Sequence, residues 1–212
     1  MLEPQLSNRV QGTRLIMGEL AKVRRGVLNH CMAVAENHGF GEIVLPLLES
    51  SGVYAERSGK NVLRKLYVLH GEKETCLRKE GTATCQILAR EALARSKNVQ
   101  LWYKIRCWEP ERLQQGLHSE FTQFGVEVLN PTHDYTECLI SMAREIVEGF
   151  TDDYEVRTNV KCRAGYYDSN CFEVVCPHLD INQQLIYGGS YNEGQGFTVG
   201  VDRMMLLTPP NS

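Results

Sequence analysis

Apolar residues recur at helical spacing in three stretches of the chain. The pattern predicts helices over residues 14–38, 82–96 and 134–149. Gly39 follows the first of them as a suitable residue for a left-handed C-terminal turn. Residues 134–137 resemble a capping box at the start of the third helix.

Shorter runs rich in β-branched and aromatic residues lie between and after these helices. They predict strands at residues 42–46, 67–70, 75–78, 102–109, 121–128, 156–161, 172–176 and 184–187. The pair 67–70 and 75–78 is expected to form a hairpin, and a last helix is expected from about Gly200. Because no repeat or linker interrupts the pattern, the sequence predicts one α+β domain over residues 1–212 with a mainly antiparallel sheet.

The predicted strand over residues 121–128 has the most informative alternation. Thr122, Phe124, Val126 and Val128 share one face, which we assign to the core. The other face carries an aromatic ring, an amide, a glycine and a carboxylate, namely Phe121, Gln123, Gly125 and Glu127. That face suits a flat ligand lying across the strand, and the strand alone equally allows a solvated face.

Composition narrows the classes of function. The chain has 212 residues, and its 23 Lys and Arg against 26 Asp and Glu give a net charge of −3. This balance provides no overall positive field for nucleic acid. The N-terminus lacks a secretory signal, and no segment approaches the roughly 18 consecutive apolar residues of a membrane span. We therefore expect a cytoplasmic protein without membrane contact.

The cysteines and histidines show no pattern of a metal site. The eight cysteines form no C-x-x-C pair, and we expect most of them to be buried thiols that pack as small apolar side chains. The six histidines show no ligand spacing, so no metal ligand is predicted among them.

Four stretches resemble the catalytic core of histidyl-tRNA synthetase, a class II aminoacyl-tRNA synthetase. Residues 11–14 with 42–46 resemble its N-terminal segment and dimer-forming first motif, and residues 77–82, Leu-Arg-Lys-Glu-Gly-Thr, resemble its L-R-P-E-G-T. Residues 101–127 resemble its second motif. Residues 166–203 resemble its Y-Y…F-E, G-G-R-Y and third-motif sequences. The resemblance implies a class II antiparallel sheet flanked by helices and a homodimer.

The resemblance also implies an amino-acid pocket. Glu80 and Gln123 would hold the ammonium of free histidine, with Thr82 beside them, and Glu127 would accept from the imidazole. The remaining residues of this implied pocket are Gly125, Tyr167, Gly189 and Tyr191.

The ATP half of the implied site departs from the family. Phe121 would stack under adenine, and Glu111 and Arg203 keep family positions at the nucleotide, which Mg²⁺ would accompany. The second-motif arginine, however, is Glu109, and a second family arginine is Cys162. One unit charge about 4 Å from another is worth about 4 kcal/mol, so reversing its sign would shift transition-state stabilisation by several kcal/mol, or on the order of 10³-fold or more in rate.

Positive charge could be restored from neighbouring positions. Arg112 in the loop and Arg163 beside Cys162 are the catalytic cations that we expect alongside Arg203. The family's insertion and anticodon-binding domain have no counterpart in these 212 residues, and with no basic patch the sequence does not favour tRNA as a partner.

Three hypotheses follow. The leading one is a histidine-binding relative of the synthetase core that acts as a sensor or as the regulatory subunit of a partner enzyme, without efficient tRNA aminoacylation. The second is an ATP-dependent ligase that forms an aminoacyl-adenylate for another acceptor. The third is a dimerisation or RNA-binding module without a ligand at Glu127.

Overall fold

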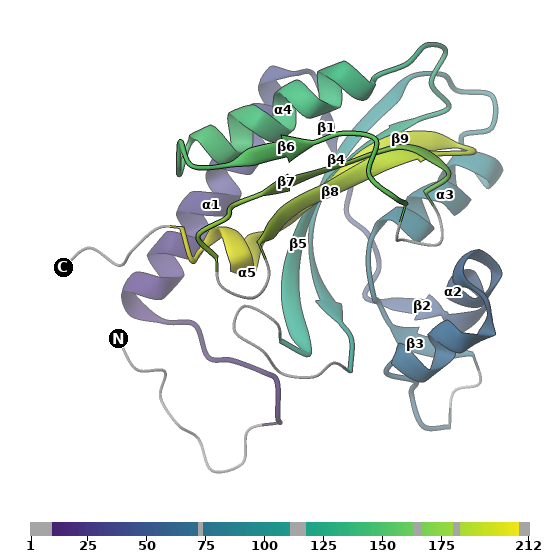
Figure 1. The fold of residues 1–212 in the computed structure, drawn as a ribbon. Coiled ribbons are helices and arrows are strands. Elements are labelled where there is room, and N and C mark those ends of the chain that lie inside the picture. Colours follow the sequence, from purple (N-terminus) through teal and green to yellow (C-terminus); the bar gives the residue numbers. More distant parts are fainter. Residues whose placement is uncertain (1–9, 72–73, 111–117, 163–166, 180–182, 208–212) are drawn as a thin grey trace.

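The computed structural model describes residues 10–71, 74–110, 118–162, 167–179 and 183–207, and its main element is a seven-stranded sheet (Figure 1). In spatial order its strands are β1 (Gly41–Glu42), β4 (Val99–Trp108), β5 (Glu120–Leu129), β9 (Gly194–Gly200), β8 (Gln184–Tyr191), β7 (Ser169–Val175) and β6 (Glu155–Arg157). The β1–β4 pair is parallel, and the other pairs are antiparallel. The predicted α+β class with a mainly antiparallel sheet is confirmed.

Two long helices cover one face of this sheet (Figure 1). They are α1 (Gly18–Asn37) and α4 (Thr136–Glu148), and the short α5 (Val201–Met204) lies beside them. The β5 side chains that the alternation assigned to the core lie here, since Phe124, Val126 and Val128 are fully buried among them. The period-2 prediction for β5 is therefore confirmed, and its other face is left for the site.

The opposite face of the sheet carries α3 (Thr82–Glu91) and a smaller unit (Figure 1). This unit pairs β2 (Leu48–Ser50) with β3 (Thr75–Leu77) and includes α2 (Ser51–Ser58) and a 3₁₀ helix, η1 (Lys60–Lys65). The buried Arg78 ties it to the large sheet, because its guanidinium donates to the carbonyls of Leu45 and Arg106. The chain enters α3 directly after this anchor.

Several predicted elements differ from the observed ones. Helix α1 begins at Gly18 rather than at residue 14, since Arg14 is drawn into an ion pair with Asp202. The expected hairpin between residues 67–70 and 75–78 forms as a short bridge between Val68 and Cys76, with backbone hydrogen bonds from Leu69 to Thr75 and from Leu77 to Tyr67, and β3 also pairs with β2.

Two further differences concern caps and glycines. No capping box forms at α4, because the Gln195 carboxamide accepts from the backbone N–H of Tyr135 at 2.6 Å and Asp134 accepts from Thr136.

Strand β9 was not predicted, since its three glycines oppose strand propensity. Gly194 and Gly196 fit there because a Cβ would lie 2.7 Å and 2.4 Å from the carbonyl oxygens of Val128 and Val126.

Candidate amino-acid and nucleotide site

A buried glutamate caps the helix that follows β3. The carboxylate of Glu80 accepts from the backbone N–H groups of Thr82 at 2.7 Å and Ala83 at 3.0 Å, which are free donors at the start of α3. Negative charge is also favoured at a helix N-terminus. Burial nevertheless dominates and raises the pKa of Glu80 to about 7.

Thr82 links this carboxylate to a second one on β5. The Thr82 hydroxyl donates to Glu127 at 2.7 Å, and the Tyr191 hydroxyl donates to the other oxygen of Glu127, also at 2.7 Å. Glu127 is fully buried, and burial raises its pKa to about 8 against the opposing effect of these hydrogen bonds. Among the described residues no ion pair neutralises Glu80 or Glu127, so two carboxyl groups share a site without a bonded cation.

Aromatic rings fill the space left by glycines around this pair. Tyr103 on β4 pairs with Gly125 on β5, and a Cβ on Gly125 would lie only 2.1 Å from the Tyr103 ring. The gap that we expected to receive a ligand is therefore taken by a protein side chain, which corrects that interpretation of Gly125. Gly189 lies in the same way beneath Tyr167 and Cys171.

A cavity of about 190 Å³ opens at the end of β5 that carries Phe121 and Gln123. Its lining residues come from β5, β8, β9 and α5 and from the ends of the β4–β5 hairpin: Glu109, His118, Phe121, Thr122, Gln123, Gln184, Leu185, Tyr187, Thr198, Gly200, Asp202 and Arg203. Phe121, Gln123 and Arg203 from the predicted site thus share one cavity. Glu80, Thr82, Glu127, Tyr167 and Tyr191 are not among the residues that line it.

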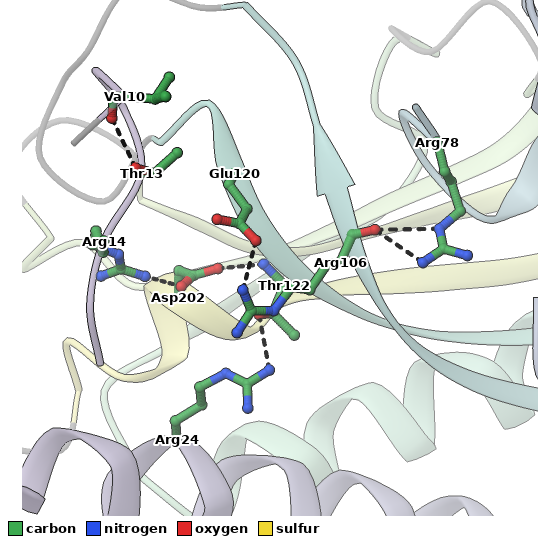
Figure 2. A network of polar contacts seen from close by, with 9 residues as sticks. All are labelled: Val10, Thr13, Arg14, Arg24, Arg78, Arg106, Glu120, Thr122 and Asp202. Carbon is green, nitrogen blue, oxygen red and sulfur yellow. Dashed lines mark hydrogen bonds and ion pairs between the residues drawn. The ribbon is translucent and has the colours of Figure 1, made fainter. Parts of the chain in front are cut away.

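The third-motif segment is anchored by a polar network at the edge of this cavity (Figure 2). Asp202 pairs with Arg14 and accepts from the backbone N–H of Thr122 at 2.6 Å. Its neighbour Arg203 donates to the carbonyl of Gln184 and lines the cavity. Arg106 pairs with Glu120 at 2.6 Å in the same network. Asp202 is a structural residue of the site that we did not predict.

The surroundings of Glu109 differ from the expectation of a carboxylate without a nearby cation. Glu109 is buried, and its carboxylate lies 2.5 Å from the Lys79 ammonium and 3.6 Å from that of Lys65. The position is therefore not an unbalanced anion, because two lysines surround one glutamate. The charge reversal at this position is therefore accompanied by two nearby cations.

Some predicted site residues cannot be placed. Glu111, Arg112 and Arg163 lie outside the described residues, so their roles stay predictions. Sequence reasoning also missed two residues that contact the site, Tyr103 and Lys79. Tyr103 was available from the alternation of β4, since it faces Gly125 across the predicted hairpin.

Five of the eight cysteines are buried thiols, and the other three are one exposed thiol and the two partners of a disulfide. Cys31, Cys76, Cys85, Cys107 and Cys176 are buried as expected, whereas Cys138 is exposed. Cys162 and Cys171 form a disulfide, which the sequence did not predict. The bond ties the segment before Tyr167 to β7, behind Gly189.

Replacing Cys162 and Cys171 together with serine should lower the free energy of unfolding by about 2–3 kcal/mol under oxidising conditions, because the cross-link restricts the unfolded chain. With excess dithiothreitol the same double variant should differ little from the wild type. Urea denaturation under both conditions measures the effect, with the exposed Cys138→Ser as control. An equal loss in both conditions would attribute the stabilisation to packing of the sulfurs.

The comparison with known families decides the lineage. Residues 12–157 match the model of the family described as histidyl-tRNA synthetase. The chain belongs to the histidyl-tRNA synthetase family. A histidine–tRNA ligase of Methanocaldococcus jannaschii is 35% identical over 122 residues, which are 56% of this chain and 29% of that relative. The chain thus matches less than a third of the length of this curated relative.

Solved structures extend the fold similarity beyond the family match. A histidine–tRNA ligase subunit from Alicyclobacillus acidocaldarius has a TM-score of 0.79 at 13% identity, over 96% of this chain and 98% of its own. A Bacillus halodurans protein described as ATP phosphoribosyltransferase regulatory subunit/histidyl-tRNA synthetase has a TM-score of 0.76 at 15% identity. The match covers 100% of this chain and 85% of the Bacillus chain. At these identities the likeness establishes the class II fold alone.

The described residues were also considered as metal ligands and as membrane-spanning helices. None of them forms a group of three or more His, Cys, Asp or Glu side chains that could hold a metal ion. No described helix is both long and apolar enough to cross a membrane.

Proposed function

We propose that this member of the histidyl-tRNA synthetase family binds free histidine, or a close analogue, and acts as a sensor or regulatory subunit without efficient tRNA aminoacylation. The observation that carries the proposal is the buried carboxyl pair of Glu80 and Glu127, joined through Thr82. Buried carboxyl groups with raised pKa values are a common feature of ligand sites.

A cationic amino acid meets the chemistry of this pair. An ammonium group has three donors, and an imidazole N–H needs one acceptor. Glu80 and Gln123 supply acceptors for the first and Glu127 for the second, with Tyr167 and Tyr191 beside the ring. Histidine would reach them from the 190 Å³ cavity by displacing hydroxyl groups that now donate to Glu127. The cavity is below the range of about 300–1,000 Å³ typical of larger ligands.

The second candidate function is an ATP-dependent ligase that activates an amino acid for an acceptor other than tRNA. Phe121 and Arg203 favour it, because an aromatic ring and a guanidinium in one cavity suit adenine and phosphate. Mg²⁺ would come with the phosphates. Against it, Cys162, at a family arginine position, is bound in a disulfide.

The assembly that we propose is a homodimer with a possible partner enzyme. Large apolar side chains are exposed around β1 and β2, including Val44 at 87%, Leu48 at 50% and Val68 at 55%. Apolar side chains gathered at one surface suit a protein contact. The regulatory role is supported by fold similarity to the Bacillus halodurans protein, and a cytoplasmic location stays a prediction.

Titration calorimetry with each of the twenty amino acids tests the proposal. We expect histidine to bind at least about tenfold more tightly than any other, since its imidazole N–H matches the acceptor that Glu127 supplies beside the tyrosine rings. Histidine-dependent exchange of pyrophosphate into ATP should be at background, and exchange above background would favour the ligase. No preference for histidine would refute the proposal.

A further inference from the structure

We infer that Lys79 provides the cation that binds the carboxylate of the amino acid, and that Glu109 holds Lys79 in place for this role. The inference rests on the proposed amino-acid site and adds the residue that recognises the ligand's negative end. It starts from the ion pair between β4 and the segment before α3, which joins residues 30 positions apart in the sequence.

The position of Lys79 is fixed at both of its ends. Its backbone N–H donates to the buried hydroxyl of Tyr54 at 3.0 Å, and its ammonium lies 2.5 Å from Glu109. The Lys79 side chain is 19% exposed and that of Glu109 11%. A lysine held in this way loses less side-chain entropy on binding a ligand than a solvated one does.

The charge around Glu109 leaves room for an anionic ligand group. Lys79 and Lys65 carry two positive charges against the single negative charge of Glu109, so this cluster has a net charge of +1. Glu109 is the member of this cluster that lines the 190 Å³ cavity, and the Lys79 ammonium lies 2.5 Å from the Glu109 carboxylate.

The polarity of the site matches a zwitterion. Lys79 precedes Glu80 in the sequence, so a cation and a carboxylate leave the backbone at adjacent positions. An α-amino acid likewise carries its ammonium and carboxylate on one carbon. Arg203, the described cation that lines the cavity, donates to the Gln184 carbonyl on β8. Lys79 is the cation next to the proposed ammonium acceptor.

Histamine tests this assignment because it is histidine without the carboxylate. Wild-type protein should bind histidine about 10–100-fold more tightly than histamine, the value of a charge-assisted hydrogen bond. Lys79→Met should weaken histidine binding by the same factor and change histamine binding less than about threefold. Lys79→Arg should keep the preference for histidine. Titration calorimetry measures both compounds with each variant.

The control is Lys104→Met, because Lys104 pairs with Glu42 on the opposite face of β4. It should leave both affinities unchanged. Should Lys79→Met fail to fold, Lys79→Gln gives the same comparison with a polar side chain. Equal weakening of both compounds, or of neither, would overturn the role of Lys79 while the proposed function stands. If the wild type bound neither compound, the proposed function and this inference would both be refuted.

Discussion

Between pH 5.5 and pH 8 the ligand-free protein should lose on the order of 5 kcal/mol of its free energy of unfolding, and Glu127→Gln should remove more than half of that loss. Burial raises the pKa of Glu127 to about 8 and that of Glu80 to about 7, against an ordinary value of 4.5. The folded protein therefore holds protons that the unfolded chain has released. Glutamine keeps the shape of the protonated side chain and cannot lose a proton.

The sign of this effect follows from proton binding. A carboxyl group whose pKa is raised by folding contributes its stability below pH 4.5 and loses it as the pH rises through the folded value. Urea denaturation at intervals across this range gives the slope. Glu173→Gln is the control, since Glu173 is also buried but accepts from the Gln184 amide and lies 3.6 Å from Arg157. A stability curve that stays flat, or a Glu127→Gln variant with the wild-type slope, would contradict the assignment.

The sequence predicted the parts of the site that depend on periodicity. Alternation along β5 separates Phe124 and Val126 from Gln123 and Glu127, because successive side chains of a strand point to opposite faces. The core face is fully buried, and the other face meets α3 and the tyrosines. One buried face fixes the register of such a strand, so the prediction needed no information from other elements.

The contacts that the sequence did not predict join residues that are distant from each other along the chain. Lys79 and Glu109 are 30 residues apart, and neither residue alone indicates that the other neutralises it. Cys162 and Cys171 are two of eight cysteines, and spacing does not select their pairing. The start of α1 likewise depends on Asp202, 188 positions after Arg14. These contacts form only when distant segments meet in the folded sheet, so the local sequence pattern does not predict them.

Gly125→Ala should lower the free energy of unfolding by about 3 kcal/mol, the upper end of typical overpacking. The new Cβ would lie 2.1 Å from the Tyr103 ring, which is fully buried and also lies 2.4 Å from a Cβ built on Gly81. The ring therefore has no free side to move toward. Gly26→Ala is the matched control, because nothing lies within 4 Å of its Cβ in α1 and alanine should stabilise that helix by about 1 kcal/mol.

The Gly125→Ala substitution also distinguishes two explanations for the glycine, namely space for a ligand and space for the Tyr103 ring. If Gly125 left space only for a ligand, Gly125→Ala would weaken binding and leave the ligand-free protein as stable as the wild type. Because Tyr103 occupies the space, we expect the loss without ligand, and we expect it to shrink in a Tyr103→Ala background, where the clash is gone. Urea denaturation of the four proteins of this double-mutant cycle gives the coupling directly. Additive losses would show that Tyr103 is not what Gly125 accommodates.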